Sequence, residues 1–196
     1  MTPPITIGVL SLQGSVEEHL LSLSRCEGVT PRAVKTVRAL QQADGLILPG
    51  GESTAIVRLL RAFGLFEPLR ERIQAGMPVW GTCAGTILLA KDLIDEPPHL
   101  GVMDITVRRN AYGRQTDSFT VSDTIPAVSP DPLPLVFIRA PWIEKAGPDV
   151  QVLHTCRGHI TAAREGRLLA TTFHPELTGQ SAFHRYFAAV VRESVN

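Results

Sequence analysis

The chain has 196 residues, with 19 Lys or Arg and 19 Asp or Glu, so its formal net charge at pH 7 is zero. Hydrophobic residues make up 44% of it, enough for a core without disulfides or a structural metal. The longest basic cluster is Arg108-Arg109, which gives little support to nucleic-acid binding. We therefore expect one domain over residues 1–196 with no nucleic-acid partner.

The lack of a recognisable targeting signal and the cysteine usage predict a cytoplasmic protein. The amino terminus has no basic region before a long apolar stretch, and no stretch approaches the length of a membrane span. Cys26, Cys83 and Cys156 form an odd set without the spacing of a disulfide framework. These features fit a reducing compartment and a chain that does not bind membranes.

Short apolar runs alternate with amphipathic stretches in the first half of the chain. Strands are expected at 5–10, 45–48 and 77–80, and the stretches between them carry apolar residues at helical spacing. The stripes are Val16, Leu20 and Leu23, and then Ile56, Leu59, Leu60 and Phe63. This alternation predicts an α/β fold of three layers: a Rossmann-like, open, mostly parallel sheet with helices on both faces.

After Lys91, strand patterns follow one another without long helices between them. They are expected at 104–109, 119–122, 135–138, 150–155, 160–164 and 168–173. The last three read as a meander with tight turns, so antiparallel strands are added to the parallel sheet. A final helix is expected over 181–193, and its aromatic and aliphatic stripe faces the core.

The segment Gly81-Thr82-Cys83-Ala84-Gly85 has the form of a nucleophile at a sharp strand-to-helix turn. Glycines on both sides let two segments approach closely, and a helix expected over 84–91 presents its amino terminus to Cys83. That position favours a thiolate and supplies amides for an oxyanion. A buried, inert cysteine is the alternative that this segment leaves open when taken alone.

His174 and Glu176 are the best candidates for the base and its orienting acid. His174 ends the apolar run 168–173, and strand ends are where open α/β sheets keep their sites. In an extended segment the side chains of His174 and Glu176 would project to the same side, with Pro175 stiffening the peptide between them. The alternative is a capping histidine beside a solvent-facing glutamate. With Cys83, the pair suits a nucleophile, a base and an acid.

Backbone amides for a developing oxyanion are expected at two glycine-containing turns. The turn Pro49-Gly50-Gly51-Glu52-Ser53 would offer the amide of Gly51, and the residue after the nucleophile would offer the amide of Ala84. Neither Walker nor dinucleotide-binding spacing is present, so phosphate binding is disfavoured.

The remaining histidines give no sign of a metal site. His154, Cys156 and His159 do not have the spacing of a closed zinc motif, and no fourth ligand is evident. His19, His99 and His184 are interpreted as surface or helix-face residues.

Cys83, His174 and Glu176, in this order, resemble the triad of class I glutamine amidotransferases. Six segments narrow the resemblance to the family of glutaminase subunits of pyridoxal 5'-phosphate synthase: 8–14, 49–54, 81–85, 109–115, 137–141 and 174–178. Several amidotransferases share 81–85, whereas Leu12-Gln13-Gly14 and 109–115 are specific to this family. The resemblance spans nearly the whole chain. Ser11 and Ser15 depart from it, since small residues such as glycine and alanine are more usual there.

The resemblance implies hydrolysis of L-glutamine to glutamate and ammonia without a metal or organic cofactor. Cys83 would form a glutamyl thioester, His174 would shuttle protons and Glu176 would fix the imidazole. The residues implied to hold glutamine are Gly51, Glu52, Ser53, Arg109, Ile138 and Arg139.

The resemblance also implies a partner, a synthase subunit that receives the ammonia and makes pyridoxal 5'-phosphate. In this family the isolated glutaminase is nearly inactive, and partner contact is thought to flip the peptide near Gly50-Gly51. Gln13 matches the residue linked to that activation. Two alternatives stay open: a glutaminase subunit of imidazole glycerol phosphate synthase, which lacks a match to 109–115, and a catalytically inactive regulatory module of the same fold.

Overall fold

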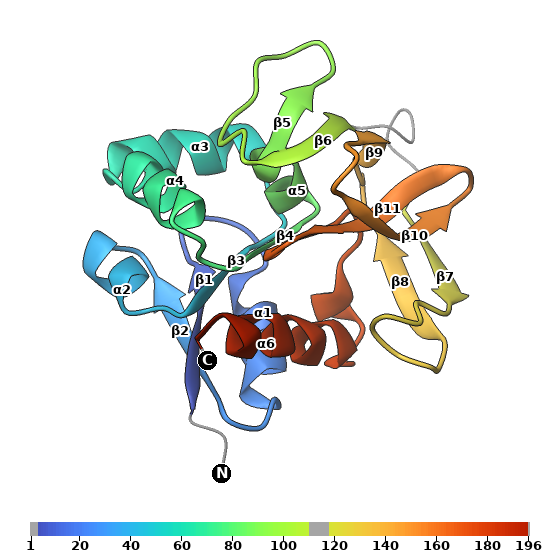
Figure 1. Cartoon of the computed structure of the whole chain (residues 1–196), viewed down its shortest axis with the longest axis horizontal. Coiled ribbons are helices and arrows are strands. Elements are labelled where there is room, and N and C mark those ends of the chain that lie inside the picture. The colour runs from blue at the N-terminus through green and yellow to red at the C-terminus, as the bar shows by residue number, and fades with distance from the viewer. Residues whose placement is uncertain (1–3, 110–117, 196) are drawn as a thin grey trace.

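The computed structural model describes residues 4–109 and 118–195, and a large sheet runs through the middle of this part of the chain (Figure 1). Its strands are β1 (Ile5–Leu10), β2 (Val29–Val34), β3 (Gly45–Leu48), β4 (Val79–Thr82), β5 (Ala90–Leu93), β6 (Met103–Arg108), β9 (Trp142–Ala146), β10 (Gln151–Cys156), β11 (His159–Glu165) and β12 (Leu168–Thr171). Their order is β2-β1-β3-β4-β12-β11-β9-β6-β5, and β10 pairs with β11.

The first five strands in this order are parallel, which confirms the predicted fold class. β1 pairs with β2 and β3, β3 with β4, and β4 with β12. All residues of β3 and β4 are buried, because helices cover both faces of the sheet. This burial is the reason that these strands have continuous apolar sequences rather than alternating ones.

The added antiparallel strands are also present. β10, β11 and β12 form the predicted meander, and β9 pairs with both β11 and β6 in antiparallel fashion. A separate two-stranded sheet consists of β7 (Phe119–Asp123) and β8 (Leu133–Phe137). The side chains of Leu133, Leu135 and Phe137 in β8 are buried in the core under the carboxy-terminal helix.

Helices lie on both faces of the sheet. α1 (Val16–Ser24) and α6 (Ala182–Val195) cover one face, and α3 (Ser53–Ala62), α4 (Phe66–Gln74) and α5 (Ala84–Leu89) cover the other (Figure 1). The short α2 (Val37–Gln41) packs Leu40 into the same core as α3 to α5. Two buried clusters result, one with Leu60, Leu69 and Leu88 and one with Leu23 and Phe187. No helix in the described ranges is long and apolar enough to cross a membrane.

Several predicted boundaries are wrong. The helix after Cys83 ends at Leu89 rather than at Lys91, because Ala90–Leu93 pairs in parallel with β6. β4 runs from Val79 to Thr82 rather than over 77–80, so Gly81 and Thr82 belong to the sheet. β2, α2, α4, β5 and β9 were not predicted.

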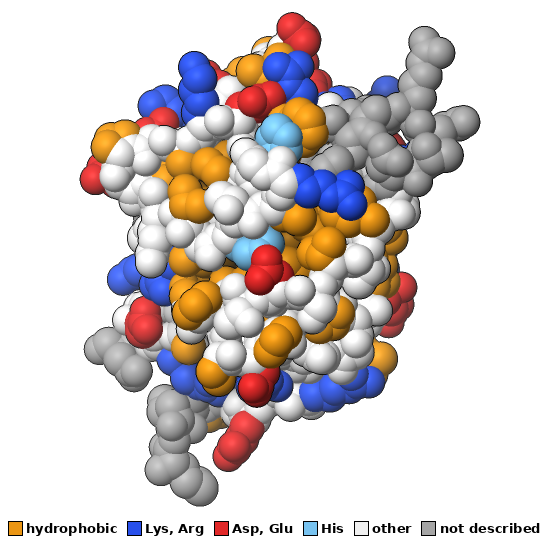
Figure 2. Space-filling view, turned by 90° about the vertical axis from the view of Figure 1, so that its right-hand side faces the viewer, with side chains coloured by type: hydrophobic (Ala, Val, Ile, Leu, Met, Phe, Trp, Pro, Cys, Tyr) orange, Lys and Arg blue, Asp and Glu red, His pale blue; other side chains and the backbone are white. Residues whose placement is uncertain are grey.

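Figure 2 shows the side of the molecule that carries β7, β8 and β10. Acidic, basic and hydrophobic side chains are interspersed on this face, and neither charge dominates it.

Candidate active site

Four neighbouring parallel strands deliver their carboxyl ends to one edge of the sheet. Val9 of β1 pairs with Ile47 of β3, Leu48 of β3 with Gly81 of β4, and Thr82 of β4 with Thr171 of β12. The segments that follow these strands are 11–15, 49–52, 83–85 and 172–176. They contain the predicted triad, the two predicted oxyanion residues, Gln13 and Glu52, because ligand sites of open α/β sheets form at this edge. The other predicted pocket residues, Ser53, Arg109, Ile138 and Arg139, lie outside these segments.

Cys83 has a strained backbone at the turn between β4 and α5. Its φ of 48° and ψ of −104° lie in a region that non-glycine residues rarely occupy. The flanking glycines are needed for close approach, as predicted. A Cβ atom on Gly81 would lie 2.4 Å from the carbonyl carbon of Gly85, and one on Gly85 would lie 2.1 Å from the oxygen of Leu48. Any side chain at position 81 or 85 would therefore clash with neighbouring backbone, so the turn at Cys83 requires glycine on both sides.

The imidazole of His174 contacts the carboxylate of Glu176, with 2.7 Å between Nδ1 and Oε1. Both residues are buried. The predicted extended segment is wrong, because Pro175–Leu177 forms a turn of 3₁₀ helix, η1, that begins after His174. The turn brings the two side chains together, whereas alternation along a strand does not operate here.

Burial and local contacts set the charges of this pair. Burial opposes the imidazolium, but hydrogen bonds to Cys83 and Glu176 outweigh it and raise the pKa of His174 to about 10. Burial also opposes the carboxylate of Glu176, yet its contacts with His19, His174 and Ser15 lower its pKa to about 2. At neutral pH the site thus holds a protonated imidazole beside an ionised carboxylate.

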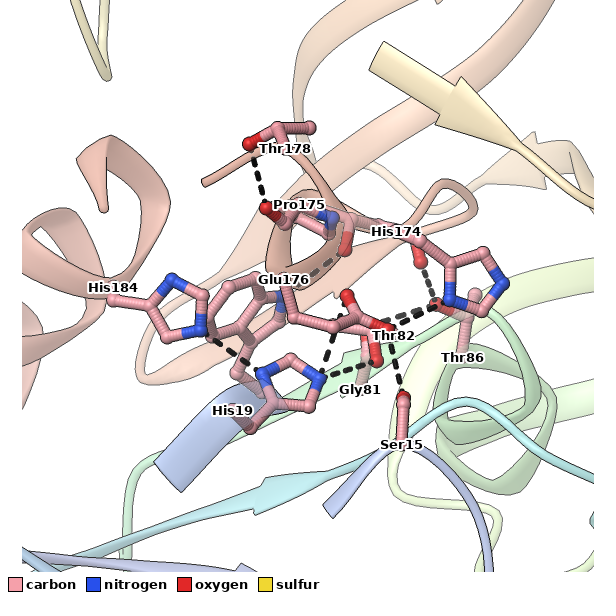
Figure 3. A network of polar contacts seen from close by, with 12 residues as sticks. Ser15, His19, Gly81, Thr82, Thr86, His174, Pro175, Glu176, Thr178 and His184 are labelled. Carbon is pink, nitrogen blue, oxygen red and sulfur yellow. Dashed lines mark hydrogen bonds and ion pairs between the residues drawn. The ribbon is translucent and has the colours of Figure 1, made fainter. Parts of the chain in front are cut away.

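Glu176 also has partners from α1 and the loop before it (Figure 3). The hydroxyl of Ser15 donates to Oε1 at 2.7 Å, and His19 Nε2 lies 3.6 Å from Oε2. His19 and His184 lie on helix faces, one of the two predicted positions, but neither is at the surface, since both are fully buried. Their spacing carried the signal: His19 lies four residues before Leu23, and His184 three before Phe187, so each shares the core-facing stripe.

The glycine turn after β3 lies directly against the imidazole. A Cβ atom on Gly50 would lie 2.5 Å from His174 Cε1 and 3.4 Å from Cys83 Cβ. The amide of Ser15 donates to the carbonyl oxygen of Gly50 at 3.0 Å. In a planar trans peptide this bond turns the N–H of Gly51 away from Ser15.

Gln13 holds the other end of this turn. Its Oε1 accepts a hydrogen bond from the amide of Glu52 at 2.9 Å, and a Cβ atom on Gly51 would lie 2.4 Å from the same oxygen. Gln13 therefore contacts the glycine turn directly, while it does not line the pocket.

An open pocket of about 190 Å³ lies beside Cys83 and His174. Its lining residues are Gly51, Glu52, Ser53, Cys83, Ala84, Ile87, Arg109, Ile138, Arg139 and His174. All the predicted glutamine-binding residues are in this set, and only Ile87 was not predicted. Glu176 lies behind the pocket, in contact with His174.

The polar groups around the pocket differ in their ion-pair and hydrogen-bond partners. Arg109 Nη1 lies 3.1 Å from Oε2 of Glu96, and Arg109 Nη2 lies 3.9 Å from Oε2 of Glu52. Ser53 Oγ is buried without a hydrogen-bond partner in the described part of the chain. Arg139 has a φ of 44°, a strained value next to Ile138. The family-specific residues 110–115 lie outside the described residues.

The cluster His154, Cys156 and His159 does not come together as a metal site. His154 contacts Thr161 and Asp123 through its two ring nitrogens, at 2.6 and 3.1 Å, and His159 stacks on Trp142. Within residues 4–109 and 118–195, no three His, Cys, Asp or Glu side chains are grouped to hold a metal ion.

Comparisons with known proteins agree on one family. A model of the SNO glutamine amidotransferase family matches residues 9–194. The pyridoxal 5'-phosphate synthase subunit PdxT of Ruminiclostridium cellulolyticum is 54% identical, over 94% of this chain and 98% of that protein. The subunit of the same name from Nocardia farcinica is 53% identical, over 95% of this chain and 86% of that protein.

Solved structures give the same result for the fold. A crystal structure of a glutamine amidotransferase has a TM-score of 0.87 and 40% sequence identity, and the match covers 94% of this chain and 98% of that chain. A glutamine amidotransferase from Thermotoga maritima has a TM-score of 0.59 over 98% of this chain and 84% of that chain. Its identity is 16%, so this second likeness concerns the fold alone.

Proposed function

Because the chain belongs to the SNO glutamine amidotransferase family and is a glutaminase subunit of pyridoxal 5'-phosphate synthase, we propose how its residues hydrolyse L-glutamine. Cys83 is the nucleophile, His174 the proton carrier and Glu176 the acid that fixes the imidazole. The observation that carries this proposal is the arrangement at one sheet edge, where Cys83 and His174 line the same pocket and His174 contacts Glu176 at 2.7 Å.

The first half of the reaction forms a thioester. The thiolate sulfur of Cys83 attacks the carboxamide carbon, and the C=O electrons move onto oxygen, where the amides of Gly51 and Ala84 stabilise the charge. His174 is protonated at neutral pH, since its pKa is raised to about 10 by contacts that outweigh burial, so it can protonate the leaving nitrogen. Ammonia leaves, and a glutamyl thioester remains on Cys83.

The second half releases glutamate. The now neutral His174 takes a proton from water as the water oxygen attacks the thioester carbon. Collapse of the tetrahedral intermediate breaks the C–S bond, which returns the electron pair to Cys83 and leaves His174 protonated. Glu176 keeps Nδ1 of His174 engaged throughout, so that Nε2 is the nitrogen that exchanges protons.

The pocket residues bind the parts of glutamine that do not react. Arg109 supplies a guanidinium for the α-carboxylate, and Glu52 supplies a carboxylate for the α-ammonium group. Ser53 Oγ is buried and has no partner among the described residues, which suits a hydroxyl that bonds substrate. Gly51, Ile138 and Arg139 complete the lining.

The partner is the synthase subunit of the same enzyme, which takes up the ammonia. Both compared relatives are named as subunits of pyridoxal 5'-phosphate synthase. Contact of Gln13 with the Gly51–Glu52 amide region supports its role in relaying partner binding to the oxyanion turn. We retain as predictions the cytoplasmic location and the absence of cofactor, nucleic-acid and membrane binding.

One assay tests this function. Glutamate release from L-glutamine is measured for the chain alone, with a pyridoxal 5'-phosphate synthase subunit, and with an imidazole glycerol phosphate cyclase subunit. We expect stimulation by the first subunit only, and no release by Cys83→Ala under any condition. Stimulation by the cyclase subunit would support the alternative glutaminase, and inactivity with both would support a regulatory module.

For Gln13, the matched comparison is between wild type and Gln13→Ala, each with and without the synthase subunit. We expect the variant to be stimulated less than wild type. Equal stimulation of the two proteins would remove Gln13 from the activation mechanism.

A further inference from the structure

Two buried histidines form a chain of contacts that ends at the triad carboxylate (Figure 3). His184 Nε2 of α6 lies 3.0 Å from His19 Nδ1 of α1. The other nitrogen of His19, Nε2, lies 3.2 Å from Thr82 Oγ1 and 3.6 Å from Glu176 Oε2. Both histidines have no exposed surface, and neither lines the pocket.

Burial keeps both rings neutral at pH 7. It lowers the pKa of His184 to about 3, with His19 as a further cause, and it lowers the pKa of His19 against the opposing attraction of Glu176. The charged groups that face His19 are Glu176 and His174 from the segment after β12, and Glu18 from its own helix. His174 already supplies one positive charge to Glu176, so a second buried cation there has no second carboxylate to balance it.

The unpartnered atoms decide which nitrogen of each neutral ring carries the proton. Among the described residues, His184 Nδ1 and Glu176 Oε2 are both buried without a hydrogen-bond partner. If His19 donated to His184, the proton of His184 would sit on Nδ1 as a buried donor with no acceptor. The lone pair of His19 Nε2 would then face the carboxylate. A buried N–H without an acceptor and a lone pair that faces a carboxylate both destabilise this arrangement of protons.

The opposite direction removes both costs. His184 Nε2–H then donates to His19 Nδ1, and His19 Nε2–H points to Thr82 Oγ1 and Glu176 Oε2. Only an acceptor nitrogen, His184 Nδ1, stays without a partner, which costs less than an orphaned N–H.

We propose that His19 is a positioning residue of the glutaminase site: its Nε2–H, fixed in that tautomer by His184, holds the Oε2 side of the Glu176 carboxylate. Ser15 and His174 engage Oε1, so both carboxylate oxygens face a donor and the carboxylate cannot rotate freely. The orientation of the His174 imidazole toward Cys83 follows from that of the carboxylate. This inference rests on the proposed function, because it assigns a role in the same reaction.

The first test is spectroscopic and uses the unmodified protein. ¹⁵N NMR of the histidine ring nitrogens distinguishes the two neutral tautomers and the imidazolium, with assignments from His19→Gln and His184→Gln. We expect both rings to be neutral at pH 7 with the proton on Nε2. A proton on Nδ1 of His19, or a charged His19, would overturn the proposal.

The second test is kinetic and separates positioning from stability. Gln places an amide donor near the Nε2 position, whereas Leu removes the donor. We expect His19→Leu, assayed with the synthase subunit, to lower kcat about tenfold with KM nearly unchanged, because a buried donor beside the triad carboxylate is lost. His19→Gln should restore most of the loss.

The matched control is His154→Gln, which changes another buried histidine that contacts Thr161 and Asp123 rather than the triad. We expect it to lower thermal stability without the same loss of kcat. Equal kcat values for wild type and His19→Leu would overturn the inference while leaving the proposed function intact. An inactive wild type would overturn the proposed function instead, and the NMR result would still decide the tautomer.

Discussion

Ser15 and Glu176, 161 positions apart in the chain, are joined by a hydrogen bond of 2.7 Å from Ser15 Oγ to Glu176 Oε1. The same carboxylate oxygen contacts Nδ1 of His174 at 2.7 Å. The backbone amide of Ser15 donates to the carbonyl oxygen of Gly50 at 3.0 Å. A single residue therefore links the triad acid to the turn that carries the proposed oxyanion amide.

Removing this hydroxyl should weaken catalysis without weakening substrate binding. For Ser15→Ala we expect kcat to fall about three- to tenfold, the range for one lost side-chain hydrogen bond. KM should stay nearly constant, because Ser15 does not line the pocket. Steady-state glutamate release with the synthase subunit measures both constants. The control is Ser11→Ala, since Ser11 Oγ donates to the oxygen of Val9 and does not touch the triad. Equal effects of the two substitutions would contradict the role of Ser15.

The triad pair should make stability depend on pH in two windows. Contacts with Cys83 and Glu176 outweigh burial and raise the pKa of His174 from 6.5 to about 10. Its stabilising contribution is therefore complete below pH 6.5 and is lost as the pH rises toward 10. Burial opposes the shift of Glu176, whose pKa nevertheless falls from 4.5 to about 2, so its contribution is present above pH 4.5 and is lost as the pH falls toward 2.

Chemical denaturation across the alkaline window measures this linkage. We expect the free energy of unfolding of wild type to decline between pH 6.5 and about 10, and the variant Glu176→Gln to show a smaller decline. The reason is that the Gln side chain no longer stabilises the imidazolium of His174. A variant whose decline matched that of wild type would show that Glu176 does not raise the pKa of His174.

A methyl group at Gly50 should displace the imidazole. Its Cβ would lie 2.5 Å from His174 Cε1, so the ring must move away from its position beside Cys83. We expect Gly50→Ala to reduce kcat/KM by about a hundredfold, the cost of misplacing a catalytic group by about 1 Å. Glutamate release with the synthase subunit is the measurement. The control is Gly147→Ala, whose Cβ would meet the carboxylate of Asp104 away from the site. A fully active Gly50→Ala would contradict the packing described for the turn.

Neighbouring arginines provide a test of the substrate pocket. Arg109 lines the pocket, whereas Arg108 pairs with Glu144 and does not. For Arg109→Gln we expect KM for glutamine to rise about tenfold or more, because a charged hydrogen bond to the substrate carboxylate is lost. Arg108→Gln should leave KM within about twofold of wild type, as most surface ion pairs contribute little. If both substitutions raised KM equally, Arg109 would not be the residue that binds the carboxylate.

Much of the fold was predictable because its signals are local. Ile5–Leu10 and Gly45–Leu48 were predicted with the bounds that the structure has, since buried parallel strands form continuous apolar runs. The end of α5 was not predictable in this way. Ala90–Leu93 follows a helix without a break and becomes a strand because β6 offers it a pairing edge. That edge comes from residues 103–108, outside any local window.

In the candidate site too, features set by neighbouring residues were predicted and contacts between distant elements were not. Gly81-Thr82-Cys83-Ala84-Gly85 predicted a sharp strand-to-helix turn from its glycine spacing, but it left an inert buried cysteine open until His174 and Glu176 were considered with it. The pairing of His174 with Glu176 was predicted from an extended segment and is made by a 3₁₀ turn instead. Ser15 and His19 were missed as neighbours of Glu176, and His184 as a neighbour of His19, since each comes from an element distant in the chain.

By itself, the sequence determined the α/β class, the family and the cysteine at its strained turn, because these depend on residue types at short spacing. The tertiary structure decided which side chains surround the triad. The order β1-β3-β4-β12 places four strand ends side by side, and α1 and α6 pack on one face of that sheet. Ser15 and His19 come close to Glu176 only when those strands pair. Hydrogen bonds need atoms within about 3 Å, and residues far apart in the chain reach that distance only in the folded structure.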